Sequence, residues 1–142
     1  MLISTKGRYA LRVMIDLAER KEDAYIPLKD IAERQGISEK YLESIVSLLS
    51  RNGLVDALRG KGGGYRLNKR PEDYSVLEIL KCTEGTLAPV SCLEGANNTC
   101  KRLKDCRTVS MWDEVYHLLQ DYFEKKKLSD LIREEGSFDF VI

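Results

Sequence analysis

The chain has 142 residues with 23 basic and 23 acidic side chains, a length that fits one compact domain or a small domain with an appendage. It holds no run of about 18 apolar residues, and its first residues lack the continuous apolar stretch of a secretory signal, so the composition argues against a membrane or secreted protein. We therefore expect a cytoplasmic protein, in which clustered cysteines are more often metal ligands or redox groups than disulfides.

The balanced total hides an uneven distribution of charge. Residues 1–71 carry 14 basic and 9 acidic side chains, a net of +5, and residues 72–142 carry 9 and 14, a net of −5. A basic front half favours an anionic partner, and chance is the alternative explanation.

Three helices are predicted in the first third of the chain. Apolar side chains recur at helical spacing over about residues 5–20, and "LKDIAERQ" forms a second helix between Pro27 and Gly36. Ser38 can cap a third helix, from about Glu39 to Ser50. The second and third helices with their tight turn are typical of a helix-turn-helix, and an ordinary helical hairpin is the alternative.

A short β-hairpin follows in "LVDALRGKGGGYRLNKRPED". Its tip, "RGKGGG", carries two cations and little bulk, so the backbone can approach a phosphate-lined groove while Arg59 and Lys61 supply charge. A nucleotide-binding loop is disfavoured, because the tip lacks the Walker spacing and opens no helix. A helix-turn-helix followed by this hairpin is typical of a winged-helix domain.

The second half begins with a capping box, "SVLE", which predicts a helix from Ser75 to about Thr83, stopped by Gly85. A polar segment at about 86–107 comes next and contains three cysteines. A long helix then reaches about Lys127, with an apolar stripe that we expect to pack mainly against a second subunit. The predicted dimer contacts are Trp112, Val115, Leu119, Tyr122 and Phe123. "LSDLIREE" predicts one more short helix, before a tail that reads "GSFDFVI".

The expected fold class is mainly α with a small β-hairpin wing. We expect a winged helix-turn-helix DNA-binding domain at 1–85, a cysteine-containing sensor loop at 86–107, and a dimerisation helix with the C-terminal tail at 108–142.

Four segments resemble one known family. "STKGRYALRVMIDLA", "PLKDIAERQGISEKYLESIVSLLSRNGLV", "RGKGGGYRL", and "TEG" followed by a cysteine loop are similar to the Rrf-two family of bacterial transcription regulators, the family of the IscR, NsrR, RirA and CymR repressors. The resemblance implies a winged-helix homodimer, held by the long helix, on a roughly palindromic double-stranded DNA operator. It implies DNA contacts by Ser38, Glu39, Lys40 and Tyr41 in the major groove, by Arg59, Gly60 and Lys61 in the minor groove, and by Lys6, Arg8 and Tyr9 on phosphates.

Several members of this family hold an iron–sulfur cluster through three cysteines in the same loop. Here seven residues separate Cys92 from Cys100 and five separate Cys100 from Cys106, which resembles the iron-responsive and nitric-oxide-responsive branches. Thiolates bind iron strongly, and a flexible loop can wrap three of them around one face of a cluster. The resemblance therefore implies that these cysteines are metal ligands.

The fourth ligand of such a cluster is open. The position of the histidine in the IscR branch is Val109 here, and the position of the acidic ligand in the nitric-oxide sensor is Arg8. Candidates are Cys82, whose simpler interpretation is a small core residue, an acidic residue such as Glu94 or Asp105, solvent, or an exogenous thiol. Zinc is the alternative metal, and three reduced thiols without any ligand are the second alternative.

We predict a DNA-binding repressor of iron–sulfur, iron or related sulfur metabolism, switched by the cluster. The alternative is a cluster-free regulator of cysteine metabolism that docks cysteine synthase, because the ending "FDFVI" resembles the tail of the cysteine-metabolism branch. An enzyme is not expected, since the chain has no Cys-x-x-Cys pair and its sole histidine, His117, is not close to a cysteine in sequence.

Overall fold

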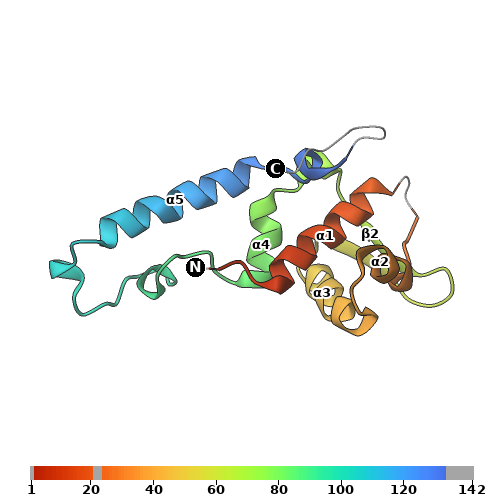
Figure 1. The fold of residues 1–142 in the computed structure, drawn as a ribbon, viewed down its shortest axis with the longest axis horizontal. Coiled ribbons are helices and arrows are strands. Elements are labelled where there is room, and N and C mark those ends of the chain that lie inside the picture. The colour runs from red at the N-terminus through yellow and green to blue at the C-terminus, as the bar shows by residue number, and fades with distance from the viewer. Residues whose placement is uncertain (1, 21–23, 134–142) are drawn as a thin grey trace.

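The computed structural model describes residues 2–20 and 24–133 of the chain (Figure 1). In these ranges the first four helices and a small hairpin form the head of the molecule, and the fifth helix forms an arm that projects from it. The elements are α1 (Thr5–Glu19), α2 (Leu28–Gln35), α3 (Glu39–Arg51), β1 (Val55–Leu58), β2 (Gly64–Leu67), α4 (Val76–Glu84) and α5 (Val109–Lys125). The prediction of a mainly helical fold with a β-hairpin wing is confirmed. The tail "GSFDFVI" lies outside the described residues.

Serine side chains mark where three helices begin. The Oγ atoms of Ser4, Ser38 and Ser75 each accept a hydrogen bond from the backbone N–H three positions on, at 3.0, 3.2 and 3.1 Å. Each bond satisfies a donor that the first helical turn leaves without an intrahelical partner. The starts of α1, α3 and α4 are therefore determined by residues that are close to one another in the sequence.

A buried carboxylate fixes α2 against α1. Asp16, only 2% exposed, accepts hydrogen bonds from Arg34 Nη2 at 2.8 Å, Arg34 Nε at 3.0 Å and Gln35 Nε2 at 2.8 Å. Arg12 donates in turn to Gln35 Oε1 at 3.1 Å. Breaking this pair would leave the buried Asp16 carboxylate without its charged partner, which is costly, so the network sets the orientation of the first helix of the helix-turn-helix.

The main core of the head is built from α1, α2, α3 and the base of the hairpin, and it also takes in a residue from beyond the arm. Met14, Leu42, Ile45 and Leu49 are fully buried there. So is Leu128, in the 3₁₀ turn Leu128–Leu131 that forms where the sequence predicts a last short helix. A second, smaller cluster lies between α4 and α5. The chain therefore returns to the head after running the length of the arm.

The hairpin is antiparallel, with Val55 paired to Leu67 at its base and Leu58 to Gly64 near its tip. Its second strand also pairs with the segment before α2, because Tyr65 and Ile26 exchange two backbone hydrogen bonds of 2.8 and 2.9 Å. Space is tight here: a Cβ atom on Gly63 would collide with the Leu58 carbonyl, and one on Gly64 with the Ile26 carbonyl. The glycines thus allow the hairpin to close against its neighbours.

Candidate nucleic-acid interface and cysteine loop

The helix α3 has one buried and one open face. Leu42, Ile45, Val46 and Leu49 pack into the head. The residues predicted to read DNA lie at the N-terminal end of α3, where Ser38, Glu39 and Lys40 are exposed and Tyr41 is partly buried. The helix therefore presents its first turn to solvent on a rigid support.

The start of α1 lies beside the start of α3. The rings of Tyr9 and Tyr41 meet edge to face, with centroids 5.8 Å apart, and the Arg12 guanidinium covers Tyr9 at 5.0 Å. Lys6 is partly exposed and Arg8 is exposed. Two residues that sequence reasoning assigned separately to phosphate contact and base reading, Tyr9 and Tyr41, are thus direct neighbours.

An open cleft of about 910 Å³ separates α3 from the wing. Its α3 wall includes Glu39, Glu43 and Ser47, and its wing wall includes Arg59 and Gly60. Sequence reasoning missed Glu43 and Ser47, although their spacing of four and eight residues from Glu39 puts all three on one helical face.

Lys61 lies exposed in the wing between Gly60 and Gly62, and it is not part of the cleft lining. All three predicted wing residues, Arg59, Gly60 and Lys61, are exposed. The structure brings Arg59 and Gly60 together with α3 around one cleft and leaves Lys61 free to reach beyond it.

The cysteine segment, residues 86–107, leads from the end of α4 to the far end of the arm, where α5 begins (Figure 1). Two short 3₁₀ turns, Ser91–Leu93 and Leu103–Asp105, are its regular structure within the described residues. Cys92 is partly exposed, and Cys100 and Cys106 are exposed. All three thiols are free and open to an incoming ligand.

Cys106 has the environment of a reactive thiol. Its Sγ lies 3.6 Å from Thr108 Oγ1, and the backbone N–H of Thr108, followed by its hydroxyl, lowers the pKa of the Cys106 thiol. A lower pKa increases the fraction of thiolate, which is the form that binds metals. The chemistry of the donor set fits thiolate ligation.

The three thiols are not assembled into a finished site. Among the described residues, no three His, Cys, Asp or Glu side chains converge on a point that could hold a metal ion. A metal or cluster would therefore require residues 86–107 to close around it.

Cys82 has a core environment, as its simpler interpretation predicted. Its Sγ donates to the Leu48 carbonyl at 3.5 Å, it packs against the main core, and burial raises the pKa of its thiol. His117 lies on α5 with Nδ1 2.8 Å from the Asp113 carbonyl oxygen.

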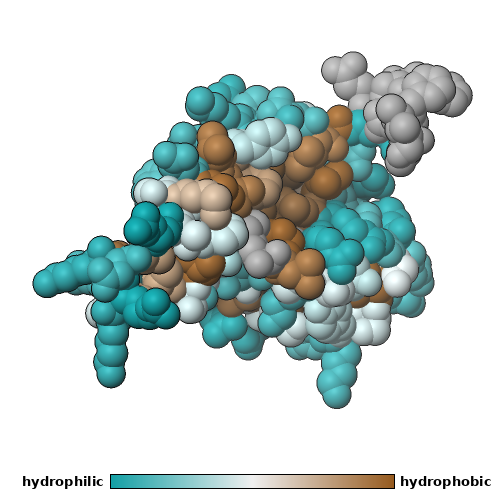
Figure 2. Space-filling model, turned by 60° about the vertical axis from the view of Figure 1, so that its left-hand side comes forward, coloured by the Kyte–Doolittle hydropathy of each residue, from teal (hydrophilic) through white to brown (hydrophobic). Residues whose placement is uncertain are grey.

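The helix α5 carries an apolar face that the described residues leave uncovered. None of its 17 residues is buried in the described structure, and Leu118 and Tyr122 are 69% and 58% exposed. Of the five predicted dimer contacts, Phe123 packs against the α4 cluster, Trp112, Val115 and Leu119 are partly exposed, and Tyr122 is exposed. Figure 2 shows hydrophobic side chains gathered in a band across one face of the molecule, bordered by hydrophilic ones.

No helix in the part of the chain that the structure describes is long and apolar enough to cross a bilayer.

Comparisons with known proteins agree with this geometry over nearly the whole chain. Residues 3–134 match the family model Rrf2, described as an iron-dependent transcriptional regulator. The chain is 35% identical over 139 residues to the HTH-type transcriptional regulator IscR of Klebsiella pneumoniae, covering 98% of this chain and 84% of that protein.

Two solved structures show the same fold. CymR of B. subtilis, described as the global cysteine regulator, matches with a TM-score of 0.73 and 34% identity, over 92% of this chain and 95% of that one. IscR of T. potens matches with a TM-score of 0.72 and 32% identity, over 99% of this chain and 94% of that one. The likeness therefore extends through the head, the cysteine segment and the arm.

Proposed function

The chain belongs to the Rrf2 family of transcriptional regulators, and from this premise we propose that it is a dimeric repressor whose binding to a roughly palindromic operator is switched by an iron–sulfur cluster in the cysteine loop. It is a DNA-binding transcriptional regulator and not an enzyme, as predicted from the sequence.

The cleft between α3 and the wing is the observation that carries the DNA-binding mode. An α-helix fits the major groove of B-DNA, and a thin basic wing fits the neighbouring minor groove. The ridge of phosphates between these two grooves would then lie in the cleft, with Arg59 on one side of it. Glu39 and Glu43, on the α3 wall, repel phosphates but accept hydrogen bonds from cytosine amino groups, so they would favour operators with cytosine at the positions they reach.

The arm supports the homodimer. An uncovered stripe on a 17-residue helix, including Leu118 and Tyr122, is the kind of face that a second copy buries. A two-fold interface places two wing-bearing heads in opposite orientations, which matches a palindromic operator.

The DNA-binding proposal is tested by selecting operators from a pool of random duplexes and measuring affinity by fluorescence anisotropy across a salt series. Arg59→Ala should reduce the slope of log affinity against log salt by about 1.8, because a dimer loses two phosphate contacts worth about 0.9 each. Lys125→Ala, which removes a cation from the last turn of α5, is the matched control and should leave the slope unchanged. Failure to enrich any duplex would contradict the proposal, as would an unchanged slope for Arg59→Ala.

The cluster proposal rests on three free thiols in one exposed segment and on the lowered pKa of Cys106. Cys92, Cys100 and Cys106 would supply three ligands, and the cluster would supply a centre that responds to iron, oxygen or nitric oxide. Closing the loop around it would order the connection between α4 and α5, which is the path from the head to the arm.

The test is iron content, acid-labile sulfide and the visible spectrum of protein purified without air. Cys100→Ala should lose the chromophore and the bound iron. Cys82→Ala should keep both, because the Cys82 thiol bonds to the Leu48 carbonyl and packs against the main core. Bound zinc without a chromophore would show that the cysteines form a zinc site and hold no cluster. Metal-free, colourless protein after reconstitution would show that they are reduced thiols without a ligand.

A second candidate is a cluster-free regulator of cysteine metabolism that binds cysteine synthase through its tail. The fold likeness to a protein described as a global cysteine regulator favours it. Removing residues 139–142 should then abolish binding to cysteine synthase in a titration by calorimetry, while operator binding stays intact. Equal binding by the shortened chain would remove this candidate.

A further inference from the structure

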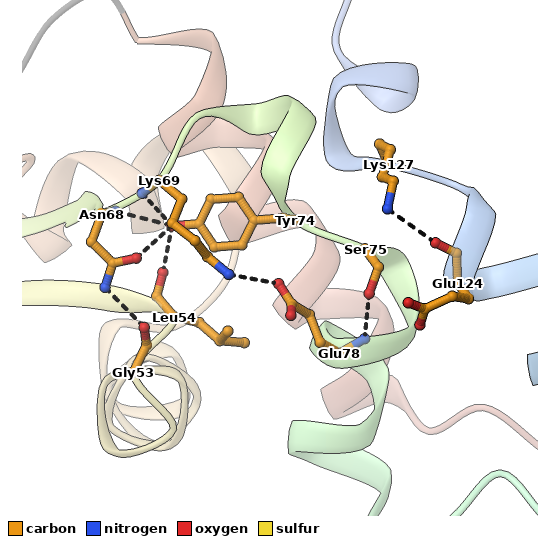
Figure 3. A network of polar contacts seen from close by, with 9 residues as sticks. All are labelled: Gly53, Leu54, Asn68, Lys69, Tyr74, Ser75, Glu78, Glu124 and Lys127. Atoms are coloured by element: carbon orange, nitrogen blue, oxygen red, sulfur yellow. Dashed lines mark hydrogen bonds and ion pairs between the residues drawn. The ribbon is translucent and has the colours of Figure 1, made fainter.

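Tyr74 occupies a buried junction between the wing and α3. It is fully buried, and it follows the 3₁₀ turn Pro71–Asp73 that leads from the wing to α4. Figure 3 shows its hydroxyl as the meeting point of several hydrogen bonds to residues at the base of the hairpin.

One hydroxyl joins the two strands at their base. Tyr74 Oη accepts from the backbone N–H of Asn68 at 2.9 Å and of Lys69 at 3.1 Å, just after β2. It lies 2.8 Å from the Leu54 carbonyl, just before β1, and 3.0 Å from Asn68 Oδ1, and these two oxygens are the acceptors for its proton. Few side-chain groups could take the place of this hydroxyl, because its oxygen must both donate and accept hydrogen bonds.

Asn68, which is hydrogen-bonded to the Tyr74 hydroxyl, also connects the wing to the end of α3. Asn68 Nδ2 donates to the Gly53 carbonyl at 2.8 Å, and Gly53 directly follows the last turn of that helix. Burial raises the pKa of the Tyr74 hydroxyl, so it stays neutral and keeps its proton near neutral pH. The junction is thus a fixed contact over the pH range in which DNA binding is measured.

A small tilt at this junction is enlarged at the wing tip. The strands have four residues each and rise about 3.4 Å per residue, so the tip lies roughly 13 Å from its base. A tilt of about 8° over that length displaces the tip by nearly 2 Å on this strand geometry, enough to break a contact to a phosphate.

We propose that Tyr74 is a positioning residue that sets the wing against α3, so that both can engage one operator at the same time. This inference rests on the proposed DNA-binding function. Tyr74 does not touch DNA and acts through Arg59 at the wing tip.

The test is a double-mutant cycle on the selected operator, at one salt concentration and well below the unfolding temperature. Tyr74→Phe keeps the buried ring and removes only the hydroxyl. It should weaken operator binding about fivefold or more in the wild-type chain and less than about twofold in the Arg59→Ala chain, because the contribution of the wing is already lost there.

Two further variants separate positioning from stability. Asp16→Asn disturbs a buried polar group that does not contact the wing, so any loss of affinity should be the same with and without Arg59. If Tyr74→Phe does not fold, Asn68→Ala breaks the exposed side of the junction without opening the core and should show the same dependence on Arg59.

Two outcomes would overturn the inference while leaving the proposed function intact. One is wild-type operator affinity in Tyr74→Phe, and the other is an equal relative decrease in affinity with and without Arg59. A wild-type chain that binds no duplex would refute the proposed function and this inference together.

Discussion

Leu128 gives the sharpest test of the described packing, because it reaches the core of the head from beyond the arm. It is fully buried with residues of α1 and α3 and with Tyr74. Leu128→Ala removes three carbon atoms, worth about 2.4 kcal/mol in transfer free energy at about 0.8 kcal/mol each, and leaves a cavity. We expect the free energy of unfolding to fall by about 3 kcal/mol, within the range for buried Leu→Ala changes.

The measurement is urea denaturation followed by far-ultraviolet circular dichroism, repeated at a tenfold lower protein concentration to account for dissociation of the proposed dimer. Leu131→Ala is the matched control, since it lies in the same 3₁₀ turn but is 38% exposed. It should cost less than about 1 kcal/mol. Equal losses from the two variants would show that the turn after α5 is not part of the core and would refute the reasoning.

Three further outcomes follow from local contacts. Gly64→Ala should weaken operator binding while the free energy of unfolding falls less, because the new Cβ collides with the Ile26 carbonyl and displaces the wing. Fluorescence anisotropy and urea denaturation, measured on the same sample, distinguish the two effects. Cys106 should react with iodoacetamide at a lower pH than an ordinary thiol, because its lowered pKa leaves more thiolate below the usual midpoint. Thr108→Val keeps the backbone N–H and removes the hydroxyl, so it should move that midpoint part of the way upward. Mass spectrometry of samples labelled across pH gives both profiles, and identical profiles would contradict the contribution of the hydroxyl. Cys82 should react with iodoacetamide only at a higher pH than Cys106 in the folded protein and lose that difference in urea, since partial burial raises its pKa.

The features that could be predicted from sequence are those encoded by neighbours along the chain. Ser38 and Ser75 cap helices because the bonds they make span only three residues. The glycine-rich tip predicts a hairpin for the same local reason. The wing residues and the N-terminal residues of α3 belong to these locally encoded elements. Their placement near one cleft could therefore be expected from the order of the elements along the chain.

What could not be predicted depends on contacts between distant segments. Tyr74 looks like an ordinary residue between a turn and a helix, and its role as a junction depends on Leu54, twenty positions earlier. Leu128 gives no local sign that it completes a core begun at α1. The three loop cysteines are close in sequence, yet that closeness does not make their thiols converge, because chain proximity sets only an upper limit on distance.

The closed packing around Gly63 and Gly64 also restricts how this protein could diverge. Any side chain at either position meets a backbone carbonyl, which cannot move aside as a flexible side chain can. On the proposed DNA-binding mode, mutations that adapt the wing to a new operator would therefore fall at Arg59 and Lys61, which are exposed. The steric limit at Gly63 and Gly64 would thus keep the shape of the hairpin while leaving the charge of its tip open to change.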